Sequence, residues 1–305
     1  MSATASWFRD YLHEKRPNLS DGSQTTYTSI LSTLYKKIFG DTGDHPDPKK
    51  FDDHEKILEC LHTMPAPSRK TVLSALIVAT GGNEHYRKQM LDDINSYNEQ
   101  IKTQEKTPQQ KESWVDSSHI HTVWQDLQSK ANRLYKLPEK TPADLQQIQN
   151  FVLLSVLGGV FFAPRRALDW TGFKINNIDP EKDNYLDKKK KELVFNRYKT
   201  AKVYGEQRVP CPPAVLKILN QWIKLMPDRE YLFFDSSNNP LSSVKVNQRF
   251  VKIFGGKKAG VNQMRHTYLT NLYGHTVEEN QKIAHTMEEM GSSPAQLTLY
   301  VKKTD

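Results

Sequence analysis

The stretch Gly260-Val-Asn-Gln-Met-Arg-His-Thr-Tyr268 organises the rest of this 305-residue chain. It places Arg265 directly before a histidine, and further on Tyr300 lies in Gln296-Leu-Thr-Leu-Tyr-Val-Lys-Lys303. A single Arg-His pair or a single tyrosine is not specific, because many residues of both kinds serve packing or solvation. Whether Arg265 and Tyr300 belong to a functional site depends on the residues that precede them in the chain.

Two upstream stretches supply further cations. Ala163-Pro-Arg-Arg-Ala-Leu-Asp-Trp170 follows an apolar helical run and holds Arg165 and Arg166. Phe195-Asn-Arg-Tyr-Lys-Thr200 lies in an expected β-hairpin and holds Lys199. A guanidinium donates two parallel hydrogen bonds to phosphate and keeps its charge, so arginines from distant parts of a chain suit a phosphodiester site.

In chain order, arginine, lysine, arginine and tyrosine resemble the active site of tyrosine recombinases, the phage-integrase family. In that family a carboxylate follows the first arginine three positions on, and Asp169 matches this for Arg166 but not for Arg165. The resemblance therefore implies that Arg166 is catalytic and that Asp169, one helical turn further, orients it. Taken alone, the Arg-Arg pair is typical of a solvated helix end.

The resemblance also implies roles for the other matching residues. Lys199 is expected to protonate the leaving 5′ oxygen, with Lys202 as the alternative. Arg265 is expected to hold the phosphate, and Tyr300 to be the nucleophile, kept near phosphate by Lys302 and Lys303.

The second motif departs from the family pattern His-x-x-Arg at its first position. Asn262 replaces that histidine, while His266 after Arg265 is retained. Asparagine can bind a phosphate oxygen but cannot transfer a proton, so we expect Asn262 and His266 to contact DNA. A further family histidine is replaced by Ser292, and the nearest substitute is His285, which is equally typical of a core or surface residue.

The family resemblance implies a mainly α fold with a small antiparallel β-sheet. An N-terminal helical core-binding domain and an α+β catalytic domain are expected to form a C-shaped clamp on double-stranded DNA. The implied reaction cleaves and rejoins DNA site-specifically through a 3′-phosphotyrosine, with no metal and no nucleotide cofactor, in an assembly of up to four copies. The divergent motifs look like those of recombinases from eukaryotic viruses, virophages and related mobile elements.

Hydrophobic periodicity predicts helices through most of the chain, independently of the resemblance. Ser23 and Ser68 are expected to cap two of them. The polar, Gln-rich segment 107–112 has no apolar face and is expected to be a linker between a helical domain, 1–106, and a catalytic domain, 113–305.

Four cations near helix starts of the first domain are candidate phosphate contacts, although each also fits a solvated helix face. They are Arg69, Lys70, Arg87 and Lys88.

The periodicity changes between Lys174 and Pro210, where a three-stranded antiparallel sheet is expected. Its strands are predicted at 174–179, 193–198 and 207–211. The run Lys188–Lys191 is expected to be a solvated hairpin tip, and a nuclear signal is the alternative.

Composition limits the classes of function. Lys and Arg outnumber Asp and Glu by 43 to 35, giving a net charge of +8 that favours a polyanionic partner. Cys60 and Cys211 are too few for a disulfide framework and indicate a reducing compartment. The longest apolar stretch, 151–163, is too short to span a bilayer, so we expect an intracellular, soluble protein acting where DNA is present.

Two other classes of protein share parts of this pattern and are the alternatives to a recombinase. A type IB topoisomerase carries the same arginine, lysine, arginine and tyrosine set but relaxes supercoils without exchanging strands. A catalytically inactive DNA-binding relative would also explain the loss of the motif histidine at Asn262.

Overall fold

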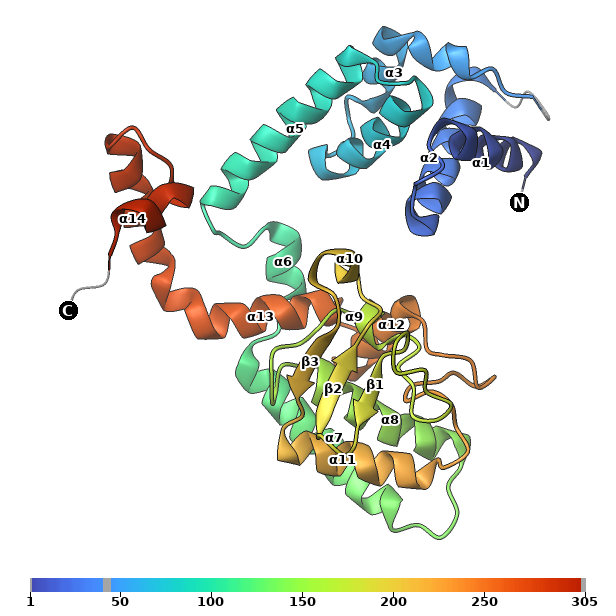
Figure 1. Ribbon diagram of the computed structural model, residues 1–305, viewed down its shortest axis with the longest axis vertical. Helices are drawn as coiled ribbons and strands as arrows, with labels where there is room; N and C mark the ends of the chain where they lie inside the picture. The colour runs from blue at the N-terminus through green and yellow to red at the C-terminus, as the bar shows by residue number, and fades with distance from the viewer. Residues whose placement is uncertain (1, 41–44, 303–305) are drawn as a thin grey trace. The chain divides into compact units, whose positions relative to one another are not determined.

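The computed structural model describes residues 2–40 and 45–302. The chain divides into two compact units, Met1–Glu105 and Lys106–Asp305, each with its own hydrophobic core (Figure 1). Both are mainly helical, and the second also contains a three-stranded antiparallel sheet. The expected fold class is confirmed.

The first unit is a helical bundle around an aromatic core. The rings of Phe8, Tyr35 and Phe51 contact one another, and the Tyr86 hydroxyl donates a 2.6 Å hydrogen bond to the Phe51 carbonyl. Tyr86 thus joins the last helix to the core. The elements are α1 (Ala3–Lys15), α2 (Asp21–Phe39), the 3-10 helix η1 (Pro48–Asp52), α3 (His54–Leu61), α4 (Ala66–Ala79) and α5 (Glu84–Lys102).

Two helices in this unit begin earlier than predicted. Ser20 caps α2, because its hydroxyl accepts a hydrogen bond from the Ser23 amide, so the choice of Ser23 as cap was wrong. Helix α4 begins at Ala66 after Pro65, so Ser68 lies inside its first turn. Proline fits the start of a helix because it has no amide hydrogen to leave unpaired there.

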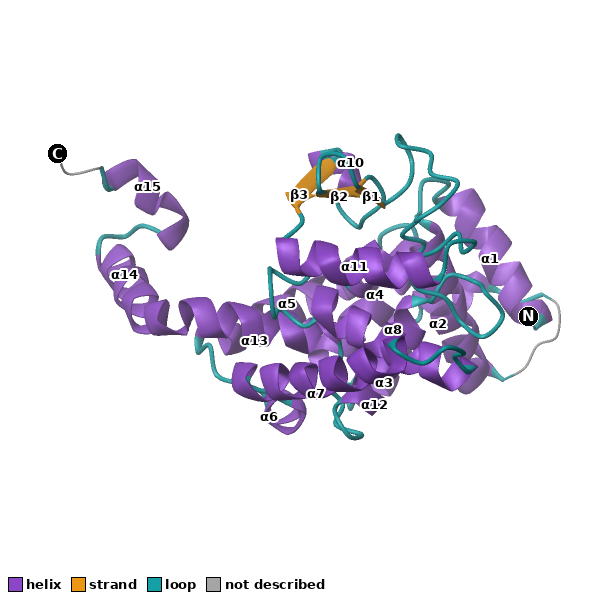
Figure 2. Cartoon of the chain, turned by 90° about the horizontal axis from the view of Figure 1, so that it is seen from below, coloured by secondary structure: helices purple, strands orange, loops and turns teal. Residues whose placement is uncertain are grey.

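The second unit is built from helices packed on one face of its sheet. Figure 2 shows α11 and α8 beneath the strands, and the indole of Trp124 on α7 donates a 2.9 Å hydrogen bond to Ser155 on α8. The elements are α6 (Pro108–Ser113), α7 (Ser117–Tyr135), α8 (Pro142–Leu157), α9 (Ala167–Trp170), β1 (Tyr185–Asp187), β2 (Glu192–Phe195), α10 (Ala201–Tyr204), β3 (Gln207–Pro210), α11 (Pro213–Leu225), α12 (Ser243–Ile253), α13 (Val261–Tyr273), η2 (Gly274–Thr276), α14 (Val277–Glu289), η3 (Pro294–Gln296) and α15 (Leu297–Tyr300).

The sheet has the order β1-β2-β3, and Phe195 pairs with Gln207 at the end of the β2–β3 ladder. The prediction of a strand at 174–179 was wrong, since Lys174 makes only isolated bridges and β1 begins at Tyr185. The Asp187 carboxylate accepts hydrogen bonds from the Lys189 and Lys190 amides and so shapes the β1–β2 turn. Its four lysines are exposed, as predicted for a hairpin tip.

The predicted linker 107–112 forms most of helix α6. A capping box starts this helix: the Thr107 hydroxyl accepts from the Gln110 amide, and the Gln110 side chain accepts from the Thr107 amide. The Ser113 hydroxyl then lies 3.5 Å from Gln263 on α13. The polar composition of this segment does not make it irregular, because its Thr-x-x-Gln pattern specifies a helix start. The domain boundary itself stays a prediction.

Two further observations concern the chain as a whole. Over residues 2–40 and 45–302, no helix combines the length and apolar character needed to cross a membrane. Cys60 is half-buried and Cys211 buried, and both are free thiols.

Candidate active site

The first arginine stands at the end of a tightly packed segment. Helix α8 ends at Gly158, and Gly159 has a positive φ of 76°. A Cβ on Gly159 would lie 3.1 Å from the Tyr268 ring of α13, so glycine permits both the backbone turn and the close approach of that helix. Arg166 follows as the N-cap residue of α9. The segment before Arg166 therefore lies beside α13.

Helix α13 carries Arg265 and has a buried inner face and a solvent-facing outer face. On the inner face Met264 is buried and the Thr267 hydroxyl donates a 2.7 Å hydrogen bond to the Val115 carbonyl. On the outer face Arg265 Nη1 lies 3.5 Å from Asn262 Oδ1, and Asn262 Nδ2 lies 3.3 Å from His266 Nε2. Arginine, asparagine and histidine thus form one contiguous polar group.

Asp169 is a buried carboxylate on which the charges of three arginines act. It is 1% exposed, and burial raises the pKa of its carboxyl above the ordinary value, although the charges of Arg165, Arg166 and Arg265 act to lower it. All three arginines are therefore close enough to act on one buried carboxylate. The charges of the two predicted arginines, Arg166 and Arg265, thus act on one carboxylate, although the residues are far apart in the sequence.

The ion pair of Asp169 differs from the expectation. Its Oδ2 accepts a 3.0 Å hydrogen bond from Nε of Arg165, not from Arg166. Arg165 precedes the N-cap residue Arg166 and is therefore not part of α9, although Asp169 lies only four positions further along the chain. Arg166 is half-buried, and its side chain makes no hydrogen bond or ion pair with the described residues, so its guanidinium is available to a ligand.

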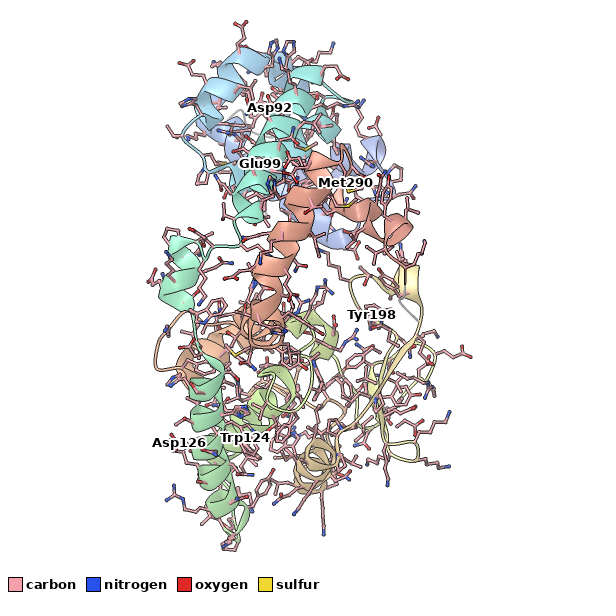
Figure 3. All side chains as sticks on the ribbon, turned by 90° about the vertical axis from the view of Figure 1, so that its left-hand side faces the viewer. Asp92, Glu99, Trp124, Asp126, Tyr198 and Met290 are labelled. Carbon is pink, nitrogen blue, oxygen red and sulfur yellow. The ribbon has the colours of Figure 1, made fainter. Side chains whose placement is uncertain are left out.

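Lys199 lies in the loop that joins β2 to β3 and directly follows Tyr198, which is labelled in Figure 3. Its side chain is exposed, as is that of Lys202 on α10. The Tyr198 hydroxyl closes this loop by donating a 2.7 Å hydrogen bond to the Gly205 carbonyl. Both lysine candidates are thus carried by a closed loop at one end of the sheet.

His285 and Tyr300 are not brought to the arginines. His285 on α14 has a 73% exposed side chain that lies 3.5 Å from Glu289, and Tyr300 on α15 is 56% exposed. In Figures 1 and 2, α14 and α15 follow α13 away from the sheet, and they pack on η2 and η3, their neighbours in the chain. Lys302 reaches the Thr298 carbonyl at 3.5 Å, and Lys303 lies outside the described residues.

An open cavity of about 560 Å³ lies beside the polar group of α13. Asn262 and His266 line it together with Lys258 and the α6 residues Gln109 and Gln110. The sequence gives no signal for Lys258, because a Lys-Lys pair after a Gly-Gly turn is also typical of a solvated loop.

Of the first-unit cations, Arg69 has a role in the fold. Its Nε and Nη2 donate to the two oxygens of buried Asp93, at 2.9 and 2.6 Å, and its Nη1 donates to the carbonyl of His62 at 3.1 Å. Its guanidinium thus joins α5 to the end of α3, and a contact of Arg69 with DNA stays a prediction. Lys70, Lys88 and Arg87 are exposed and stay predictions.

Comparison with solved structures identifies the fold. A Tn1549 transposon integrase fragment, in complex with transposon right-end DNA, aligns with 100% of this chain and 96% of its own, at a TM-score of 0.52 and 13% identity. The chain has the tyrosine recombinase fold. The structure of XerA recombinase covers 99% of this chain and 94% of its own at 15% identity, with a TM-score of 0.33. No family model and no curated protein matches the sequence. At such low identity the comparison shows the recombinase fold and leaves the chemistry to the site residues.

Proposed function

We propose that this chain is a site-specific recombinase or integrase that breaks and rejoins double-stranded DNA through a 3′-phosphotyrosine intermediate. The observation that carries the proposal is that the segment leading to Arg166 lies against the helix of Arg265, at Gly159 and Tyr268, in a chain with the recombinase fold. The net charge of +8 supports a polyanionic partner, and the Tn1549 integrase is described in complex with transposon DNA. We infer that the chain serves a mobile DNA element.

In the cleavage step, the Tyr300 oxygen attacks the scissile phosphorus while the bond from phosphorus to the 5′ oxygen breaks. The electron pair of that bond goes to the 5′ oxygen, which takes a proton from Lys199, while the phenol proton passes to water or a nearby base. Arg166 and Arg265 stabilise the charge that grows on the non-bridging oxygens. Rejoining reverses these steps with a new 5′ hydroxyl, so the reaction needs no external energy source.

The polar group on α13 supports Arg265. Asn262 accepts from Arg265 and approaches His266, so both side chains are placed to contact the phosphate that the arginine holds. Asn262 can donate a hydrogen bond to phosphate but cannot carry a proton, and His266 can do both. We therefore assign phosphate binding to both residues.

Tyr300 must approach the arginines when DNA is bound. Its helix α15 packs on neighbouring chain segments, and the phenol ring is more than half exposed. We propose that DNA binding brings this segment to the cations, from the same protomer or from another copy. Exchange of strands requires two duplexes and hence self-association on DNA, in an assembly of up to four copies.

The proposal is tested by trapping the covalent intermediate. The full chain is incubated with a pool of nicked duplexes of randomised sequence, in which the short 5′-hydroxyl strand diffuses away after cleavage. A DNA adduct that survives denaturation is expected, and sequencing its DNA gives the cleavage site. Absence of any adduct, with DNA binding retained, would instead support an inactive DNA-binding relative. Supercoil relaxation without strand exchange between two such sites would support a topoisomerase.

A further inference from the structure

Arg165 stands next to the proposed catalytic Arg166 but is held inside the second unit. Its side chain is only 17% exposed. Besides the Asp169 pair, its Nη1 donates a 2.7 Å hydrogen bond to Gln207 Oε1, and its guanidinium lies 4.1 Å from the centre of the Phe195 ring and 5.0 Å from that of Tyr198. One side chain therefore contacts four residues of three elements and their connecting loop.

The partners of Arg165 are placed at the base of the Lys199 loop. Phe195 and Gln207 are the final paired residues of β2 and β3, so the loop leaves the sheet from this pair and returns to it there. Tyr198, one residue before Lys199, carries the hydroxyl that closes the loop onto Gly205. Arg165 thus contacts the departure point, the return point and the interior of the loop.

Asp169 binds the Arg165 guanidinium on the side away from the Lys199 loop. The carboxylate is buried on α9, the helix that begins directly after Arg166, and its Oδ1 has no hydrogen-bond partner among the described residues. The Arg165 charge therefore does two things at once. It compensates a buried anion, and it joins the helix that follows Arg166 to the loop that carries Lys199.

We propose that Arg165 is a positioning residue that sets the distance between the Lys199 ammonium and the phosphate held by Arg166. The inference rests on the proposed function, because it concerns the proton transfer to the leaving 5′ oxygen. General acid catalysis depends on hydrogen-bond reach, and a displacement of about 1 Å can cost on the order of a hundredfold in rate. A planar guanidinium that donates in two directions and stacks on aromatic rings suits this role, and lysine does not reproduce it.

The test uses a leaving group that needs no acid. In DNA with sulfur in place of the bridging 5′ oxygen, attack by the tyrosine oxygen expels a thiolate, which leaves without being protonated. Cleavage of this DNA and of ordinary DNA is compared at the sequence recovered from the adduct pool. Lys199→Ala is expected to be slow on ordinary DNA and restored by sulfur, whereas Arg166→Ala is expected to be slow on both.

Two variants probe Arg165 without leaving Asp169 unpaired. Gln207→Ala removes only the bond on the hairpin side, and Arg165→Lys keeps the positive charge while losing the fork and the ring stacking. Both are expected to slow ordinary cleavage by about ten- to a hundredfold and to recover on the sulfur substrate, as Lys199→Ala does. Arg208→Gln is the matched control on the same strand, because its ion pairs are with Glu206, Glu192 and Asp187 and not with a partner of Arg165. Its ratio of the two rates should equal that of the unmodified chain.

The outcomes separate this inference from the proposed function. If the unmodified chain cleaves neither substrate, the proposed function fails. If it cleaves both, but Gln207→Ala and Arg165→Lys are slowed equally on the two substrates or on neither, the positioning role is wrong. Should Arg165→Lys fail to fold, Gln207→Ala and Tyr198→Phe, which opens the loop without touching Asp169, decide the question by the same ratio.

Discussion

The ion pair between Arg69 and Asp93 is expected to stabilise the first unit, and replacing Arg69 by methionine tests this. Methionine keeps an unbranched apolar stem but removes both hydrogen bonds to Asp93 and those to the end of α3. The Asp93 side chain is 4% exposed, so the variant leaves a buried carboxylate whose remaining partner is the Gln89 amide. Removing one member of such a pair costs about 3 kcal/mol, even allowing for the partly exposed edge of the arginine.

Native-state hydrogen exchange on the full chain measures this cost where it acts. A loss of about 3 kcal/mol corresponds to a fall on the order of a hundredfold in the protection of the slowest amides of α4 and α5. Arg87→Met is the matched control on α5, because its Glu84 pair is exposed and should leave protection unchanged. In the double variant Arg69→Met with Asp93→Leu, most protection should return, since an apolar pair replaces both charges.

The same pair predicts a pH dependence with a definite sign. The hydrogen bond from Arg69 lowers the pKa of the Asp93 carboxyl below its ordinary value, although burial acts the other way. Its stabilisation is thus present above the ordinary aspartate pKa and is lost as pH falls through the lowered folded-state pKa. The difference between the unmodified chain and Arg69→Met should shrink in that acidic range. Unchanged protection at neutral pH together with weaker DNA binding would refute this account and return Arg69 to the DNA surface.

Three further predictions concern the boundary and the site. Limited proteolysis should cut the chain between α5 and α6, at 103–107, and release a stable C-terminal fragment that begins between 103 and 113. Cuts confined to other regions would argue against two domains. Asn262→His should keep or raise the rate of adduct formation, and Asn262→Leu should lower it without abolishing it, because asparagine only binds a phosphate oxygen. A total loss of adduct in Asn262→His would mean that the pocket is built differently from the family pattern. His285→Ala should slow adduct formation by about tenfold if His285 replaces the missing family histidine, as a proton-transfer residue would, and an unchanged rate would make it a surface residue.

Much of the fold was predictable because it follows from local pattern. The apolar stripes of α2, α8 and α11 and the alternating strands β2 and β3 are visible in the sequence, and their period fixes the element type. The first strand was misplaced at 174–179 because neither this stretch nor β1 shows a clear alternation of apolar and polar residues. What decides between them is the turn that Asp187 makes with the lysine run, a contact between side chain and backbone.

The candidate site was predictable in its residue types but not in its contacts. Two arginines and a lysine were chosen by order and spacing, yet the sequence does not show which neighbour takes Asp169. Arg165, which precedes the N-cap residue Arg166, takes it through a 3.0 Å hydrogen bond from its Nε. The bond from Arg165 to Gln207 crosses between segments far apart in the chain, so only the folded sheet reveals it.

Arg69 illustrates the same limit in the first unit. An arginine near a helix start fits both a phosphate contact and a buried ion pair, and its partner Asp93 lies on another helix. No periodic pattern links the two positions. The choice depends on how α4 and α5 pack, which is a tertiary property.

The most direct test of the central claim is the covalent adduct formed by Tyr300→Phe. A phenol attacks phosphate only where clustered cations stabilise the developing charge, and Arg166, Arg265 and Lys199 are the groups proposed here. Removing one exposed hydroxyl should leave folding and salt-sensitive DNA binding nearly unchanged. The account predicts that the unmodified chain forms a denaturation-resistant adduct with nicked DNA, with Tyr300 in the cross-linked peptide, and that Tyr300→Phe forms none. An adduct of equal yield in Tyr300→Phe would contradict the assignment and show that another side chain is the nucleophile.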